Sequence, residues 1–324
     1  MNLQVFSGRA NPALSQNIAK ALGIPLGKVA VKAFPDGELL VKYTQNIRGD
    51  DIFIIQPTCN PPSENLVELL IMLDAAKRAS AKRITAVLPY YGFARQDRKD
   101  QPRVPITAKL VANLLVSAGA HRILAMDLHS QQIQGFFDIP VDHLYAAPVF
   151  IRYLRKAIDM NNCMIVSPDS GGVKMAHAYA TEMHTGLAIA AKRRIDPDTV
   201  SMLHLVGDVK GRDCVLVDDM TTTAGTLCGA AAKLKEAGAK RVFAAVSHCC
   251  LTDEGHVKLR DSDITELVTT DSVPQQNGVA DSKIKVLSVA GLLGKAIKRI
   301  HKDQSVSSLF RVQEETSSAD SSEE

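Results

Sequence analysis

Short apolar segments without polar alternation recur along the chain, and longer segments with helical periodicity separate them. For example, Ile52–Gln56 is almost wholly apolar, and Glu64–Ser80 then carries leucines at helical spacing. Unalternated apolar strands are typical of parallel sheets that helices cover on both faces. The pattern therefore predicts an α/β fold, with mainly parallel sheets flanked by helices.

The same pattern predicts the individual elements. Besides a hairpin with arms Val29–Phe34 and Leu39–Tyr43, strands are expected at Leu3–Phe6, Ile52–Gln56, Ile84–Leu88, His121–Met126, Cys163–Ser167, Leu187–Ala191, Cys214–Val217, Arg241–Val246, Ile264–Thr269 and Ile284–Leu287. Helices are expected at Pro12–Leu22, Glu64–Ser80, Thr107–Ser117, Ala147–Ile158, Gly172–Glu182, Leu227–Ala237 and Ala290–His301.

Two carboxylates and a loop of Thr, Ala and Gly follow the apolar run Cys214–Val217. Asp218 and Asp219 come first, and the loop leads into a predicted helix. Backbone N–H groups of such a loop, together with the helix N-terminus, favour a phosphate. Carboxylates can accept hydrogen bonds from sugar hydroxyls or bind a metal. The segment predicts a sugar-phosphate site, and the alternative is an acidic turn that only caps the helix.

Two pairs of segments resemble each other between the halves of the chain. Arg48–Gln56 resembles Lys210–Asp218, and Ala81–Val87 resembles Ala239–Ala245, at offsets of 162 and 158 residues. We infer two copies of one α/β unit, of which only the second has the paired acids. The predicted division is a domain at 1–145, a second domain at 146–303, a closing segment at 304–312 and a disordered acidic tail at 313–324.

The segment Tyr90–Lys99 combines aromatic and basic side chains after a predicted strand. Aromatic rings can stack on a base, and arginines can bind phosphates. The segment predicts nucleotide contact, and the alternative is a basic surface loop.

Four further candidate residues follow predicted strands. His129 and Asp169 could share one cation, for which Mg²⁺ is expected beside phosphates, although a single His is usually a hydrogen-bonded structural residue. Lys192 and Arg194 lie in a basic loop that could close on a transferring phosphate group. The alternative for this loop is a solvated surface.

The overall composition fits a soluble protein. The formal net charge of +3 is too small to indicate nucleic-acid binding, and the tail contributes five of the negative charges. The six cysteines show no C-x-x-C spacing, which favours reduced thiols in the cytoplasm. Neither a signal peptide nor an apolar run of membrane-spanning length is visible, so no membrane partner is expected.

Taken in order, several motifs resemble those of class I ribose-phosphate pyrophosphokinases. The resemblance covers about Leu3 to Phe310 and rests on Phe34–Glu38, Tyr90–Lys99, Asp127–Phe137, Ser167–Gly172, Lys192–Arg194, Val217–Thr226 and Ser305–Phe310. It implies two similar phosphoribosyltransferase-like domains. It also implies transfer of the diphosphate of ATP to the 1-hydroxyl of ribose 5-phosphate, with release of AMP.

The resemblance also implies roles for single residues. The residues implied in ATP binding are Phe34, Asp36, Gly37, Glu38, Arg95 and Gln96. Those implied for ribose 5-phosphate are Asp218, Asp219, Thr222, Thr223, Ala224, Gly225 and Thr226. His129 and Asp169 would serve Mg²⁺, and Lys192 and Arg194 would stabilise charge on the transferring group.

Family members form hexamers in which the Asp-Gly-Glu turn reaches a neighbour's ATP site, and phosphate and ADP are their usual allosteric ligands. This sequence departs from the family at Thr222, where Asp is usual, and at Met175, where Arg is frequent. Two alternatives to an active synthase are a non-catalytic regulatory subunit and a phosphoribosyltransferase that consumes the same diphosphate sugar. The retained Lys192, Arg194 and His129 argue against the first, and the additional first half argues against the second.

Overall fold

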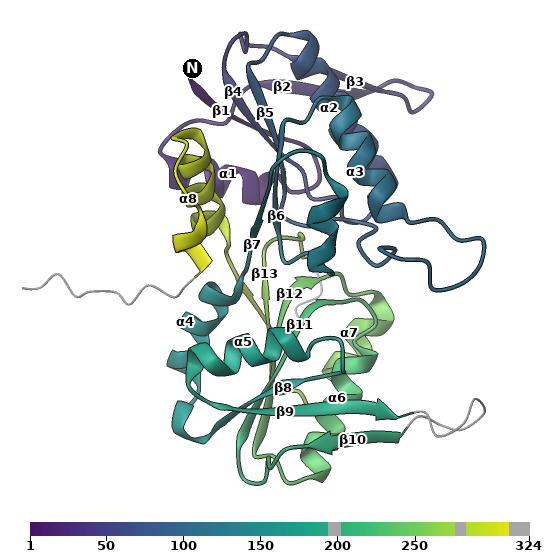
Figure 1. The fold of residues 1–324 in the computed structure, drawn as a ribbon, viewed down its shortest axis with the longest axis vertical. Coiled ribbons are helices and arrows are strands. Elements are labelled where there is room, and N and C mark those ends of the chain that lie inside the picture. The colour runs from purple at the N-terminus through teal and green to yellow at the C-terminus, as the bar shows by residue number, and fades with distance from the viewer. Residues whose placement is uncertain (194–201, 276–282, 311–324) are drawn as a thin grey trace, which may run out of the picture.

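Two large sheets follow one another along the long axis of the molecule in this computed structural model (Figure 1), which describes residues 1–193, 202–275 and 283–310. The first sheet has five strands in the order β1-β4-β5-β6-β7, and every neighbouring pair is parallel. Its strands are β1 (Leu3–Ser7), β4 (Asp51–Ile55), β5 (Arg83–Leu88), β6 (Arg122–Met126) and β7 (Val141–Leu144).

The second sheet has seven strands in the order β10-β9-β8-β11-β12-β13-β14, and only the β9–β10 pair is antiparallel. Its strands are β8 (Cys163–Ser167), β9 (Gly186–Arg193), β10 (Met202–Val206), β11 (Asp213–Thr221), β12 (Arg241–Cys249), β13 (Glu266–Thr270) and β14 (Ile284–Leu287). A separate hairpin is formed by β2 (Val29–Ala33) and β3 (Leu39–Tyr43).

Helices cover both faces of both sheets (Figure 1), as the unalternated strands predicted. The helices are α1 (Pro12–Leu22), α2 (Pro62–Arg78), α3 (Thr107–Ala118), α4 (Ala147–Ala157), α5 (Val173–Met183), α6 (Gly225–Glu236), α7 (Asp253–Arg260) and α8 (Ala290–His301). Short 3₁₀ segments are η1 (Gln131–Phe136), η2 (Met160–Asn162) and η3 (Ser307–Phe310). The predicted α/β class is confirmed.

Alternate residues of a strand point to opposite faces of its sheet and pack in different cores. On β4, Phe53 and Ile55 pack in a core shared with α1, α4, α5 and α8, whereas Ile52 and Ile54 pack against α2 and α3. The shared core also contains Val215 of β11, so it runs continuously beneath both sheets. This common layer holds the two halves together.

The predicted repeat extends over the whole of both sheets. After the first strand of each half comes an antiparallel hairpin, and four further parallel strands follow in the same spatial order. Equivalent ion pairs open the second and third parallel strands: Arg83 binds Asp51 through two nitrogens, and Arg241 binds Asp213 in the same way. Both halves thus retain one architecture, and we keep the predicted domain division as a proposal.

The closing helix α8 packs on α1 of the first half, although it follows the second sheet in sequence. Its end is fastened there by His301, whose Nδ1 lies 2.8 Å from Asp51, and by the Arg83–Asp303 ion pair of 2.8 Å. The chain thereby returns to the half in which it began.

Some elements differ from the prediction. The strand expected at Cys214–Val217 continues to Thr221, because its backbone keeps pairing with β12 through His248 and Cys249. The strand β9 likewise includes Lys192, which pairs with Leu203 of β10. The short elements β7, β10 and α7 were not predicted, because each is four to eight residues long and interrupted by polar residues.

The predicted acidic tail, 313–324, lies outside the described residues. None of the helices in the described ranges combines the length and apolar character needed to cross a membrane.

Candidate active site

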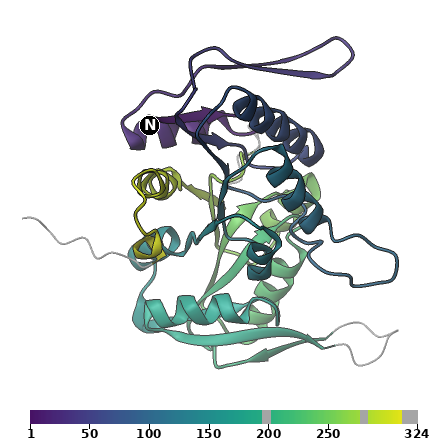
Figure 2. The ribbon, with the colours of Figure 1, turned by 45° about the horizontal axis from the view of Figure 1, so that its top comes forward.

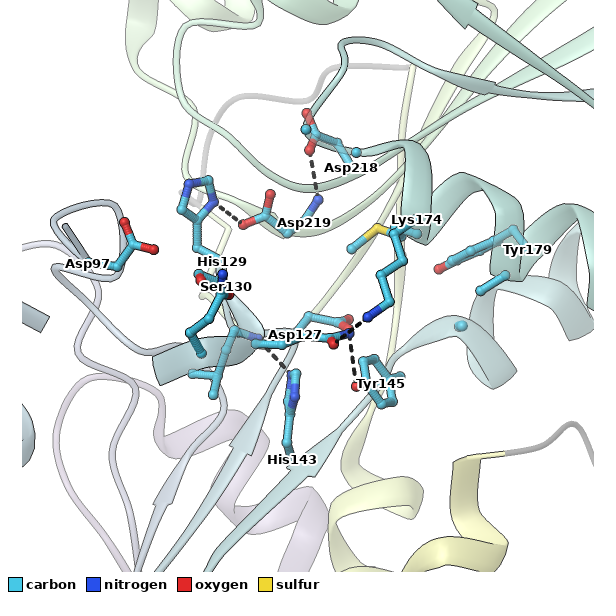
Figure 3. Close-up of a pocket in the computed structure, with 18 of the residues that line it drawn as sticks. Asp97, Asp127, His129, Ser130, His143, Tyr145, Lys174, Tyr179, Asp218 and Asp219 are labelled. Carbon is cyan, nitrogen blue, oxygen red and sulfur yellow. Dashed lines mark hydrogen bonds and ion pairs between the residues drawn. The ribbon is translucent and has the colours of Figure 1, made fainter. Parts of the chain in front are cut away.

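A cavity of about 1070 Å³ opens at the carboxyl ends of strands from both sheets (Figure 3). The segments that follow β5, β6 and β8 line it, together with the end of β11. Ligands in open α/β sheets bind at such strand ends. Of the predicted site residues, the cavity brings together Arg95, His129, Asp169, Asp218 and Asp219.

An ion pair joins the two halves at this cavity. His129 Nδ1, after β6, lies 2.8 Å from the Oδ2 atom of Asp219 on β11 (Figure 3). The hydrogen bond with Asp219 raises the pKa of His129 against the opposing effect of burial. Burial would raise the pKa of Asp219, but the hydrogen bond and charge of His129 outweigh it, and this pKa is lowered overall. The pair therefore favours a protonated imidazole beside an ionised carboxylate.

Asp218 has no such cationic partner among the described residues. Burial, followed by the negative charges of Asp219 and Asp169, raises the pKa of Asp218 to about 8. Its Oδ1 accepts the backbone N–H of Asp219 at 2.9 Å, which offsets only part of this effect. A cation or a hydroxyl donor at this carboxylate would therefore be bound favourably.

The loop after β11 lies against an arginine from the first half. Arg95 places Nη2 3.4 Å from Thr222 Oγ1 and Nε 2.9 Å from Met220 Sδ. Ala224 has a left-handed backbone (φ 55°) and precedes α6, which starts at Gly225. The predicted residues Thr222 to Thr226 thus adjoin a helix N-terminus, but none of them lines the cavity wall.

The remaining predicted residues are not gathered at the cavity. Phe34, Asp36, Gly37 and Glu38 lie at the exposed tip of the β2–β3 hairpin, which projects from the body of the molecule (Figure 2). Gln96 does not line the cavity. Its Oε1 atom accepts a hydrogen bond from the hydroxyl of Thr107 on α3.

The two predicted catalytic residues are described only in part. Lys192 occupies the penultimate position of β9, and only its backbone is described. Arg194 lies outside the described residues.

Other residues of the cavity were not predicted as site residues. Lys174 Nζ of α5 lies 3.1 Å from Gln131 Oε1, and Tyr145 and Phe310 pack edge to face with centroids 5.7 Å apart. All four residues line the cavity. Lys174 follows the motif Ser167–Gly172 by two residues, whereas Tyr145 gave no signal because it lies beyond an unpredicted strand.

Comparisons with known proteins agree with this geometry. Residues 3–119 match the model of the N-terminal domain of ribose phosphate pyrophosphokinase, and residues 190–311 match that of a phosphoribosyl synthetase-associated domain. A ribose-phosphate pyrophosphokinase of Chlorobaculum tepidum is 51% identical over 308 residues, covering 95% of both chains. One from Agrobacterium fabrum is 50% identical over 309 residues, covering 95% of this chain and all of the relative. The chain belongs to the ribose-phosphate pyrophosphokinase family.

A solved structure supports the same placement. The phosphoribosylpyrophosphate synthetase of Mycobacterium smegmatis superposes with a TM-score of 0.89 at 41% identity, covering 94% of this chain and 100% of that one. The superposition extends over both halves, so the two chains share the second sheet as well as the first.

Proposed function

We propose that this protein transfers the diphosphate group of ATP to the 1-hydroxyl of ribose 5-phosphate, giving AMP and 5-phosphoribosyl 1-diphosphate for nucleotide biosynthesis. The observation that carries the proposal is the cavity in which Arg95 and His129 of the first half face Asp169, Asp218 and Asp219 of the second. Arg95 suits the phosphates of a nucleotide, and the three carboxylates of the second half suit sugar hydroxyls and a cation.

Ribose 5-phosphate would bind at the second half. Asp218 and Asp219 would accept hydrogen bonds from the ribose hydroxyls. The backbone N–H groups of Thr222 to Thr226, at the start of α6, would hold the 5-phosphate. The raised pKa of Asp218 favours a partner that donates hydrogen bonds.

ATP would bind against the first half. Arg95 would bind its phosphates and Gln96 would support the same segment. Since Phe34, Asp36, Gly37 and Glu38 project away from this cavity, we propose that the hairpin tip contacts ATP in a neighbouring subunit of a homohexamer.

The residues at the cavity fit Mg²⁺. Within the described residues, no three His, Cys, Asp or Glu side chains have the spacing of a complete metal site. Mg²⁺ is commonly held by one or two carboxylates together with substrate phosphates and water, so a complete protein cage is not required. Asp169 and His129, both lining the cavity, would hold it, with His129 binding through Nε2 in its neutral form while Nδ1–H still donates to Asp219. The ion would neutralise charge on the phosphates.

Lys192 and Arg194 would supply the other positive charge. The sugar hydroxyl attacks the β-phosphorus of ATP in line, and negative charge increases on the transferring oxygens. Cationic side chains that contact these oxygens in the transition state lower the barrier more than they strengthen binding.

Regulation and location are part of the same proposal. From the family resemblance we infer that phosphate and ADP act as allosteric ligands and that the enzyme works in the cytoplasm. Neither inference affects the assignment of the transfer reaction.

A single assay tests the function. The purified full-length chain is incubated with ATP, Mg²⁺ and ribose 5-phosphate at several phosphate concentrations, and AMP and the diphosphorylated sugar are quantified. Equal amounts of both products are expected. Absence of AMP at every phosphate concentration would contradict the proposal and favour a regulatory subunit.

Replacing Thr222 by Asp is expected to change the KM for ribose 5-phosphate, or the Mg²⁺ concentration at half-maximal rate, by about 3-fold or more. The new carboxylate would lie within reach of Arg95, now 3.4 Å from the Thr222 hydroxyl, and would add negative charge beside the phosphate loop.

Steady-state kinetics with each substrate and with Mg²⁺ measure this effect. Thr222→Ser is the matched control, because it keeps the hydroxyl. If Thr222→Asp changes neither quantity, residue 222 has no role in substrate or metal affinity.

A further inference from the structure

The turn that carries His129 has a strained backbone. Asp127, directly after β6, has φ 39°, a left-handed conformation that costs a non-glycine residue about 1 kcal/mol or more. Such a turn persists only where surrounding groups fix it. Two buried histidine side chains, His143 and His248, form hydrogen bonds with its peptide groups from opposite sides.

His143 holds the turn from the first half. It lies on β7, paired with Ala125 of β6, and its Nε2 accepts the backbone N–H of Leu128 at 3.0 Å (Figure 3). Its side chain is buried, and burial lowers the pKa of His143 to about 4. The ring is therefore neutral at physiological pH. Because Nε2 accepts, the proton of the neutral ring resides on Nδ1, which therefore does not accept from the Gln134 Nε2 group 3.3 Å away.

His248 holds the same turn from the second half. It lies on β12, and its Nε2 is 3.2 Å from the carbonyl oxygens of both Met126 and Asp127. Carbonyl oxygens only accept, so Nε2 carries the proton. Its Nδ1 is 2.9 Å from the hydroxyl of Ser272, which can donate to it. Burial lowers the pKa of His248 despite the nearby carboxylate of Asp127, so this ring is neutral as well.

The two rings therefore have opposite roles. His143 accepts the N–H of Leu128, and His248 donates to the carbonyl oxygens of Met126 and Asp127. Because His248 belongs to the second sheet, its hydrogen bonds also fix the distance between this turn and β11. That distance sets the 2.8 Å contact between His129 and Asp219.

We propose that His143 and His248 are positioning residues, which clamp the 126–128 turn from opposite halves and so aim His129 at Asp219 in the cavity. The consequence for catalysis rests on the proposed function, in which His129 and Asp219 serve the Mg²⁺ and ribose subsites. The clamp itself is a property of the fold.

Paired substitutions of His143 test the clamp. His143→Leu removes the acceptor and leaves the Leu128 N–H buried without a partner, whereas the amide oxygen of His143→Gln reaches the position of Nε2 and can still accept it. We expect His143→Leu to lower kcat about 10-fold or more, with a smaller change in the KM for ATP, and His143→Gln to stay within about 3-fold of wild type.

His121 provides the matched control. Its Nδ1 accepts the backbone N–H of Ile84 at 3.1 Å, but it is exposed and does not line the cavity. His121→Leu therefore removes the same type of hydrogen bond elsewhere in the first sheet. We expect it to leave kcat unchanged.

Hydrogen–deuterium exchange supplies a readout that does not depend on activity. The peptide covering residues 124–132 should exchange at least about 10-fold faster in His143→Leu than in wild type, and at nearly the wild-type rate in His143→Gln. If His143→Leu proves insoluble, His248→Gln, which keeps an N–H donor, is compared with His248→Leu, and the same ordering is expected.

The outcomes separate the two proposals. Unchanged exchange and unchanged kcat in His143→Leu would overturn the clamp. Faster exchange of the same size in His121→Leu would also overturn it, because the effect would not be specific to the turn. An inactive wild-type protein would refute the proposed function, and the exchange data would still decide on the clamp.

Discussion

Replacing Lys192 by Ala is expected to lower kcat roughly 100-fold, while the KM values for ATP and ribose 5-phosphate change by less than about 3-fold. A cation that contacts the transferring diphosphate contributes mainly in the transition state, where charge on its oxygens increases. The backbone of Lys192 lies near the end of β9, which pairs with the edge strand β10, in the half that carries Asp218 and Asp219. Single-turnover and steady-state assays separate the two effects.

Lys233→Ala is the control for this variant. Lys233 lies on α6 of the same half, is half-buried and pairs with Glu236 at 2.5 Å, so its loss removes one positive charge away from the cavity. A kcat in Lys192→Ala equal to that of this control would exclude Lys192 from the catalytic role.

Replacing Asp218 by Asn is expected to abolish more than about 99% of kcat and, at the same time, to stabilise the substrate-free protein at pH 8. Activity falls because Asn cannot replace the carboxylate as an acceptor of ribose hydroxyls or as a partner of a cation. Stability rises because the neutral amide avoids an ionised group that the fold buries beside Asp219 and Asp169.

The sign of the pH dependence follows from the pKa of Asp218. Folding raises this pKa from 3.8 to about 8, so the native state retains a proton that the unfolded state releases. The contribution of Asp218 to the free energy of unfolding of the wild-type protein is therefore fully present below about pH 4 and is lost as the pH rises toward 8. The free energy of unfolding of Asp218→Asn should exceed that of wild type by at least about 2 kcal/mol at pH 8, and by little near pH 4.

Urea denaturation at several pH values measures this difference. Asp261→Asn is the control, because Asp261 is exposed at the end of α7. A stability difference between Asp218→Asn and wild type that does not vary with pH would show that the pKa of Asp218 is not raised.

The site itself was predicted unevenly from sequence. Asp218 and Asp219 were predicted from local chemistry, because carboxylates beside an apolar strand stand out in a single segment. The role of His129 as a partner of Asp219 was not predicted, because the two residues are 90 positions apart. His143 and His248 gave no signal either, since a buried structural histidine has no distinctive neighbours in sequence.

The sequence by itself determined the class of fold and the duplication. Segments such as Asp51–Ile55 and Cys163–Ser167 are apolar at nearly every position, and such segments are stable only as strands covered on both faces. The repeated Asp and Arg at the starts of paired strands reappear in the structure as equivalent ion pairs. These features depend on residues close together in the chain.

Only the tertiary structure decided which parts of the two copies meet. It placed α8 on α1, directed the β2–β3 hairpin away from the cavity, and brought His129 to Asp219. Local periodicity specifies a strand or helix through the side chains it must bury, but it does not specify how two sheets are oriented. That orientation follows from the shared apolar layer beneath both sheets, whose contacts join residues far apart in the chain.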